Sequence, residues 1–234
     1  MKSFAHEIAG MPVHASDGDI GTIKDVVFDP QSWTVRYLEV STGWLFGRDV
    51  LIPVDKVKSI EAPEGAVTFD LTKEEIEKSP PAEPARPVDR SYEGRLMGYY
   101  GLSPYWAAPP EMGVPPQALP VGQRPPEASQ ASQAPELLFA GDIDGYELDA
   151  QGERVGTVRD VLVDLDTWKI TSLMADLGGL FTRDSATIGT APITGIDVEN
   201  RIVHVSMPKE TVDRNHRTGI DDLPYVFPYV PPIA

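Results

Sequence analysis

A nine-residue segment occurs twice in this chain of 234 residues, and the repeat constrains the fold more than any other feature. Residues 21–29 read GTIKDVVFD and residues 156–164 read GTVRDVLVD, with five of the nine positions identical. The same offset of 135 aligns SWTVRYLEVSTGWLFGRD (32–49) with TWKITSLMADLGGLFTRD (167–184). Two copies of about 70 residues are too few for a solenoid. The repeat therefore predicts a tandem duplication of one small domain.

Within each copy the local patterns are those of short β-strands bounded by Gly, Pro and Asp. In the first copy the expected strands are 21–29, 35–42, 50–53, 57–61 and 66–69. About six short strands at regular spacing favour a small antiparallel barrel, which closes on itself and leaves no free edge. Thr72 with Glu75 three residues later is a capping-box pattern, so a short helix should follow the last strand. We predict a mainly β fold of two small antiparallel barrels, each followed by a short helix.

Proline divides the chain into four segments. We expect a first barrel domain at 1–78, a linker at 79–136, a second barrel domain at 137–217 and a tail at 218–234. Thirteen of the 23 prolines lie in residues 79–135. Because proline fixes φ and lacks a backbone donor, the linker should be extended, semi-rigid and without a core of its own.

The linker and the tail are also rich in aromatic residues, which a plain spacer does not need. Aromatic side chains concentrate binding energy at protein interfaces. Trp44 belongs to the same class, because its counterpart in the second copy is Gly179 and the shared fold does not require it. The alternative is that the aromatic residues fold back onto the barrels and cover apolar surface. The candidate partner contacts are Trp44, Tyr99, Tyr100, Tyr105, Trp106, Tyr225, Phe227 and Tyr229.

Composition excludes several classes of function. The formal net charge of −16, without a Lys/Arg cluster, disfavours binding to nucleic acid. The absence of cysteine excludes disulfides, thiolate catalysis and Cys-ligated metals. No stretch approaches the ~20 apolar residues of a membrane-spanning helix. We therefore expect a soluble cytoplasmic protein that reaches a membrane only through a partner.

The polar residues of the repeat do not form a recognisable catalytic set. Asp25 and Asp29, four residues apart, share a strand face, but acid–base catalysis needs a close pair in a dry site. We favour Asp29 as a cap for the turn before Pro30. Residues 142–153 resemble a calcium loop but carry Tyr and Glu at positions five and six, where an oxygen ligand and glycine are required.

The histidines and the loop motifs lead to the same conclusion. The four histidines form no metal-type pair at i and i+4. The sequence contains no phosphate-binding glycine loop and no nucleophile elbow. We predict no enzyme activity, no metal and no cofactor.

Three motifs of the first copy resemble the PRC-barrel domain. They are the G-x-(I/V)-x-D-(I/V)-x-(F/V)-D strand at 21–29, the RYLEV strand at 36–40 and the LIP return strand at 51–53. The resemblance covers both copies and leaves only the linker and the tails outside. It implies a small antiparallel β-barrel used for docking.

The first copy is also similar to the cytoplasmic domain of the photosynthetic reaction centre H subunit, which caps the reaction centre and shields its quinone sites. This resemblance implies that Asp29 is a proton-path carboxylate and that Arg36 and Glu39 belong to the same proton path or form ion pairs. Ser32 stands where a further acidic residue is expected, which counts against proton delivery. The membrane helix of the H subunit has no counterpart, so attachment would require protein contacts.

We therefore hypothesise a non-enzymatic cytoplasmic subunit that caps a membrane protein complex, most specifically a photosynthetic reaction centre. It would bind the core subunits by protein contacts, without nucleic acid and without a transmembrane segment of its own. The alternative is a soluble adaptor of the ribosome-maturation or stress-response type, whose barrel binds a ribosomal protein.

Overall fold

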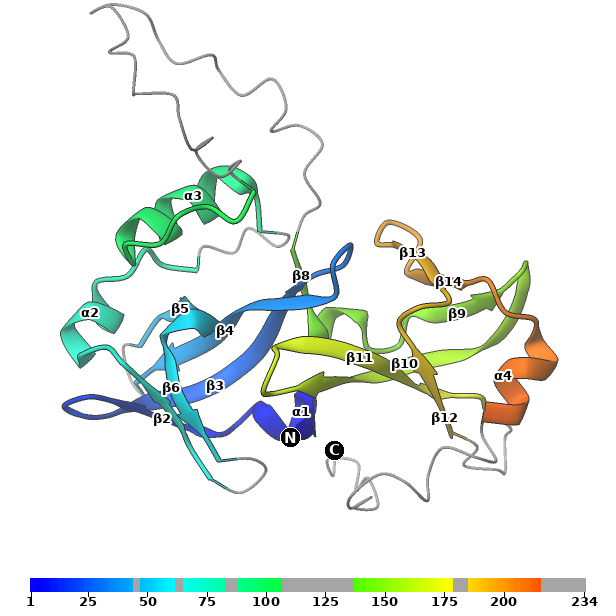
Figure 1. Cartoon of the computed structure of the whole chain (residues 1–234), viewed down its shortest axis with the longest axis horizontal. Coiled ribbons are helices and arrows are strands. Elements are labelled where there is room, and N and C mark those ends of the chain that lie inside the picture. The colour runs from blue at the N-terminus through cyan, green and yellow to red at the C-terminus, as the bar shows by residue number, and fades with distance from the viewer. Residues whose placement is uncertain (44–46, 62–64, 83–87, 107–136, 179–184, 216–234) are drawn as a thin grey trace, which may run out of the picture.

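The computed structural model describes residues 1–43, 47–61, 65–82, 88–106, 137–178 and 185–215. Each copy of the repeat forms the same succession of elements, and the first copy lies on the left of Figure 1. Its elements are β1 (Lys2–Phe4), α1 (Ala5–Ile8), β2 (Pro12–Ala15), β3 (Gly18–Asp29), β4 (Thr34–Thr42), β5 (Asp49–Pro53), η1 (Val54–Lys56), β6 (Val57–Ile60), β7 (Val67–Phe69) and α2 (Lys73–Glu77).

The second copy repeats this order of strands, with a 3-10 turn, η3, in place of α1 and no described 3-10 turn between β12 and β13. Its elements are β8 (Leu138–Phe139), η3 (Ala140–Ile143), β9 (Glu147–Ala150), β10 (Glu153–Asp164), β11 (Lys169–Asp176), β12 (Ser185–Gly189), β13 (Ile193–Asp197), β14 (Ile202–Val205) and α4 (Lys209–Asn215). The predicted strands and the duplication are thus confirmed. The capping box that starts α2 is present, since Glu75 accepts from the Thr72 N–H at 2.7 Å.

Each copy forms a curved sheet in the order β6-β7-β2-β3-β4-β5 and its counterpart β13-β14-β9-β10-β11-β12. Neighbours are antiparallel except that β7 runs parallel to β2, and β14 runs parallel to β9. Among the described strands no ladder joins β5 to β6 or β12 to β13, and the short turn η1 connects β5 to β6 instead. The expected mainly β fold of two barrel-type domains is thus present, with η1 rather than a ladder between β5 and β6.

The two copies exchange their first strands. β1 of the first copy pairs with β10, and β8 at the start of the second copy pairs with β3. Phe4 faces Leu162, and Phe139 faces Val27, two pairs related by the repeat offset of 135. Each copy therefore completes its partner's sheet, and one 14-stranded sheet runs through both.

At the centre of this junction, the contacts made by the two copies are related by a twofold axis. The N–H of Val35 donates to the Trp168 carbonyl at 2.8 Å, and the N–H of Ile170 donates to the Trp33 carbonyl at 2.8 Å. These two bonds are exchanged by the repeat offset, and Thr34 faces Lys169 between them. Trp33 and Trp168 adopt left-handed backbone conformations, with φ of 52° and 53°, which are uncommon for bulky residues.

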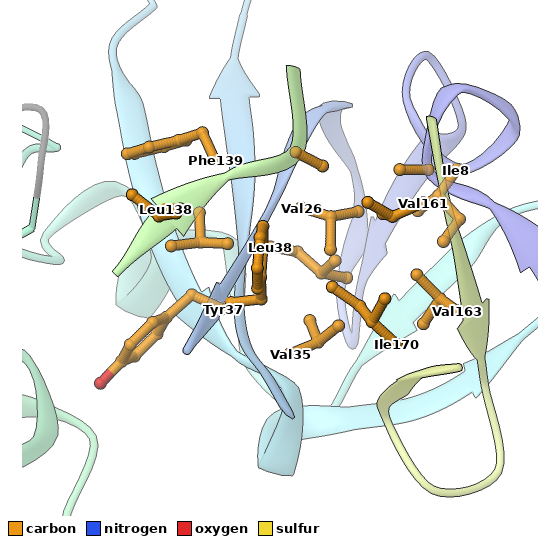
Figure 2. Packing of buried hydrophobic residues seen from close by; sticks show 14 of the residues in the cluster. Ile8, Val26, Val35, Tyr37, Leu38, Leu138, Phe139, Val161, Val163 and Ile170 are labelled. Atoms are coloured by element: carbon orange, nitrogen blue, oxygen red, sulfur yellow. The ribbon is translucent and has the colours of Figure 1, made fainter. Parts of the chain in front are cut away.

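One apolar core is shared by both copies. Figure 2 shows Val26, Val35 and Leu38 of the first copy packed near Val161 and Ile170 of the second. All five side chains are at most 2% exposed. Because burial of apolar surface is the main favourable contribution to folding, the shared core ties the copies together more strongly than the backbone bonds alone.

Within the predicted linker, Arg90–Tyr99 form a helix, α3, where the sequence predicted an extended chain. The physical reason is a proline-free stretch between Pro87 and Pro104, headed by Asp89, whose side chain accepts from the Tyr92 N–H at 2.7 Å. Such N-cap bonds satisfy a donor that the first turn leaves open. The helix lies over β4 and β5 of the first copy (Figure 1).

Candidate functional site

One aspartate in each copy of the repeat, Asp25 or Asp160, acts between the copies. Asp160 accepts from the backbone N–H of His6 at 3.4 Å, and Asp25 accepts from the N–H of Gly141 at 3.1 Å. His6 and Gly141 are separated by the repeat offset. A carboxylate is favoured beside the first N–H groups of a helical turn, which have no partner within the turn. Asp25 therefore binds the first helical turn of the second copy, and Asp160 binds that of the first copy.

The repeated glycines are required by close backbone approach. A Cβ atom on Gly21 would lie 1.9 Å from the Ser41 carbonyl oxygen, and one on Gly156 would lie 2.2 Å from that of Asp176. No side chain can be accommodated at either distance. The glycines and aspartates of the opening repeat thus specify strand packing and the junction between copies.

Asp29 caps the turn that follows β3, as predicted. Its side chain accepts from the Gln31 N–H at 2.9 Å and from the Ser32 hydroxyl at 2.8 Å. Burial raises the pKa of Asp29, but these hydrogen bonds and the guanidinium of Arg36 outweigh it and hold the pKa below the ordinary value. Asp29 is therefore a fixed negative charge at neutral pH. Asp164 caps the equivalent turn by accepting from the Asp166 N–H at 3.0 Å.

A buried polar cluster joins α3 to the first copy. The hydroxyl of Tyr37 donates to Glu93 at 3.0 Å, and Arg90 donates to the other carboxylate oxygen of Glu93 at 2.7 Å. Tyr37 points away from the shared core in Figure 2, and both it and Glu93 are at most 1% exposed. Burial raises the pKa of Glu93, while Arg90 and the tyrosine hydroxyls lower it and offset only part of this effect.

Above this cluster, two arginines and two aromatic rings form a surface that we call the aromatic–arginine patch: Arg36, Arg90, Tyr105 and Trp106. The Arg36 guanidinium lies 3.6 Å from the Tyr105 ring centre, and that of Arg90 lies 4.3 Å from the Trp106 ring centre. The two rings meet edge to face at 4.9 Å. Arg90 also donates to the Tyr105 hydroxyl at 2.6 Å, and burial raises the pKa of that hydroxyl to about 12. Cation–π contacts of this kind hold aromatic rings in fixed positions.

A pocket of about 360 Å³ lies beside the patch. Arg36 of β4, Asp55 of η1 and Tyr105 line one part of it, and Thr167 and Trp168 of the second copy line another. The patch therefore borders the junction between the copies. Trp106 is 40% exposed, which leaves much of its ring on the surface.

The structure brings some of the sequence-predicted residues together and places others apart. Arg36, Tyr105 and Trp106 come together in the patch, with Asp29 3.6 Å from Arg36. Glu39 is 3% exposed and lies 3.4 Å from Lys24, which also pairs with Asp49 at 2.5 Å.

The remaining aromatic candidates lie elsewhere. Tyr99 is 39% exposed and donates to the Glu75 carbonyl at 2.6 Å, beside α2. Tyr100 is only 6% exposed and belongs to the core, so it is covered by the chain itself. Trp44, Tyr225, Phe227 and Tyr229 lie outside the described residues.

Sequence reasoning missed Tyr37, Arg90 and Glu93. Tyr37 reads as an ordinary strand residue, although its counterpart in the second copy is Ser172. That large-to-small difference at one repeat position was an available signal that something covers this face in the first copy alone. Arg90 and Glu93 are three residues apart, a spacing that brings their side chains together only once the segment is known to be helical.

In the described part of the chain, no group of three or more His, Asp or Glu side chains is placed to hold a metal ion. None of the helices in those residues has the length and apolarity that crossing a membrane requires. The aromatic–arginine patch is thus the site with the most distinctive chemistry.

Comparison with known families agrees with the duplicated architecture. The PRC-barrel domain matches residues 1–76 and 136–212, which together make up more than half of the chain. This chain belongs to the PRC-barrel family. Among curated proteins, none matches it. PRC-barrel domains are general protein-interaction modules, so a docking role follows from the family, while the partner does not.

Proposed function

We propose that this PRC-barrel protein is a non-enzymatic docking subunit of a membrane protein complex, and that the complex is a photosynthetic reaction centre. The observation that carries the docking role is the aromatic–arginine patch. Its rings are fixed from below by the buried Tyr37–Glu93–Arg90 cluster and remain partly exposed. Preorganised aromatic and arginine side chains are the usual centres of binding energy in protein interfaces.

The choice of partner rests on the first copy. Its GTIKDVVFD, RYLEV and LIP segments are those that resemble the H subunit, and the patch is built on the same copy through Arg36 and Tyr37. The role that we assign is assembly and shielding of the quinone side of the complex. Proton uptake through Asp29 is not part of it, because a lowered pKa favours a fixed charge over a proton carrier.

The test is direct binding of the full chain to a purified reaction-centre core from which H-type subunits have been removed. We expect a complex that Trp106→Ala weakens about 30-fold, since a central aromatic residue contributes about 2 kcal/mol or more. Val198→Ala serves as the matched control, because Val198 is also exposed, at 43%, but lies beyond β13 in the second copy.

Two outcomes would overturn the proposal. One is the absence of binding to the core at micromolar concentrations. The other is co-sedimentation of the chain with ribosomal subunits, which would support the adaptor role instead. Equal loss with Trp106→Ala and Val198→Ala would keep a docking role but remove the patch as its location.

A further inference from the structure

The contacts between the copies include several that would change if the two copies were alike. Lys169 and Thr34 face each other at the centre of the twofold relation, separated by the repeat offset. Lys169 donates to the Thr34 hydroxyl at 2.5 Å and to the Ser32 carbonyl at 3.1 Å. In a pair of like copies, this position would face itself. Two first copies would place threonine against threonine, and two second copies would place lysine against lysine, which repel each other.

The aspartate contacts differ in the same way. The His6 ring contacts Asp160 as an ion pair, whereas the equivalent partner of Asp25 is Gly141, which has no side chain. A Cβ atom on Gly141 would lie 2.9 Å from Asp25 Oδ2, so the aspartate occupies the space that glycine leaves. Two first copies would place His6 in that space. Two second copies would place Gly141 against Asp160 and lose the ion pair.

The N-terminus adds a third unlike contact. The Met1 ammonium pairs with Asp166, and the Leu165 N–H donates to the Met1 carbonyl at 2.8 Å. The first copy can make these contacts because β1 is exchanged onto the second copy. The exchange and the shared core supply affinity, and the unlike contacts add selectivity between partners.

We infer that residues 1–106 present an interaction surface whose partner is the second copy, residues 137–215. This surface binds the unlike copy without the covalent connection and discriminates against a like copy. The chain is then a linked heterodimer, and the segment 107–136 only raises the effective concentration of one half near the other. This inference does not depend on the proposed function, because it concerns contacts within the chain.

The experiment starts from the full chain with a specific protease site inserted between Pro120 and Val121. After cleavage, size-exclusion chromatography and native mass spectrometry should show one 1:1 complex of the two fragments. We expect Lys169→Thr in the cleaved protein to raise the dissociation constant of the fragments about tenfold, which corresponds to 1.4 kcal/mol. Lys58→Thr is the matched control, since Lys58 is an exposed lysine of β6 away from the junction, and it should leave the constant unchanged.

Three results would overturn the inference. They are fragments that separate on cleavage, fragments that aggregate because they no longer support each other, and complexes of two like fragments in statistical proportion. Circular dichroism of the uncleaved Lys169→Thr protein distinguishes weakened association from misfolding. If both the spectrum and the dissociation constant are unchanged, Lys169 does not contribute to the selectivity between copies, and the inference is contradicted.

Discussion

The two copies have the same strand frame but different outer faces. In the first copy, β4 and β5 carry Tyr37, Glu39 and Leu51 on one face, all at most 3% exposed. The same face of β11 and β12 carries Ser172, Met174 and Thr187, of which the last two are half-buried. The first face is covered by the helix α3, which is anchored through Tyr37.

This difference separates two kinds of residue in a duplicated protein. Residues that both copies keep, such as Gly21/Gly156 and Asp25/Asp160, build the frame and the junction. Residues at which the copies differ, such as Tyr37/Ser172 and Arg36/Thr171, build the surface of one copy alone. Identity between repeats therefore marks the shared frame, whereas divergence marks either unlike contacts at the junction or the outer face of one copy.

The largest expected effect comes from the shared frame. Gly21→Val and Gly156→Val should each lower the free energy of unfolding by about 3 kcal/mol or more, because both Cβ positions overlap a strand carbonyl. Urea unfolding measures this. Gly94→Ala in α3 is the control, since open space surrounds its Cβ and alanine should stabilise the helix by about 0.5–1 kcal/mol. Tolerance of valine at only one of the two repeat positions would break the equivalence of the copies.

The next effect should be confined to the first copy. Glu93→Ala leaves Arg90 and Tyr37 buried without their partner, and we expect a loss of about 2–3 kcal/mol. Hydrogen exchange should show that α3 loses protection while β10 and β11 keep theirs. Glu74→Ala is the control, since its pair with Lys78 is exposed to solvent and should contribute little to stability. Equal loss of protection in both copies would show that the outer faces are not independent.

A smaller effect compares the two junction aspartates. Asp160 is 7% exposed and Asp25 is half-buried, so Asp160→Ala should cost about 2 kcal/mol and Asp25→Ala about 1 kcal/mol. Chemical denaturation of both variants tests this order. Asp70→Ala, at an exposed position after β7, controls for the change in net charge. If Asp25→Ala destabilised the protein more than Asp160→Ala, the contact between His6 and Asp160 would add nothing to stability.

The smallest effect is the pH dependence of the contact between His6 and Asp160. The equivalent contact between Gly141 and Asp25 has no histidine. The hydrogen bond to Asp160 raises the pKa of His6 above its usual 6.5. The folded state therefore binds the proton more tightly than the unfolded state, so the stabilisation is complete below about pH 6.5 and is lost as pH rises through the folded pKa. His6 is 60% exposed, so we expect less than about 1 kcal/mol.

Thermal unfolding of the wild type and of His6→Gln at about pH 5.5 and about pH 8 isolates this contribution. The difference in stability between the two proteins should be larger at the lower pH. A difference that is the same at both values, or larger at the higher pH, would contradict the assignment.

Much of the frame could be predicted from the sequence. The offset of 135 located both copies, and β-strand patterns placed β3, β4, β5, β6 and β7 within a few residues of their observed bounds. The turn role of Asp29 followed from its position before Pro30. These features are local, so they can be recognised from a few neighbouring residues.

The exchange of β1 and β8 could not be predicted, because a strand of two or three residues has no period and its partner lies more than 100 residues away. The role of Asp160 was missed for the same reason, since its acceptor function depends on where His6 arrives. In the patch, Trp106 and Tyr105 were recognised as aromatic residues. Arg36 and Arg90 hold these two rings in place only because α3 covers β4. Strand patterns in the sequence do not reveal that packing.

The exchanged strands bear on how such a chain can change over time. In a symmetric dimer of one gene product, every substitution appears on both sides, so a residue that improves one surface is also imposed on the other. Joining the two copies in one reading frame removes this constraint. Position 37 can become tyrosine while position 172 remains serine, and lysine can arise at position 169 without meeting itself across the axis. Duplication thereby lets the two halves carry different surfaces on a common strand frame.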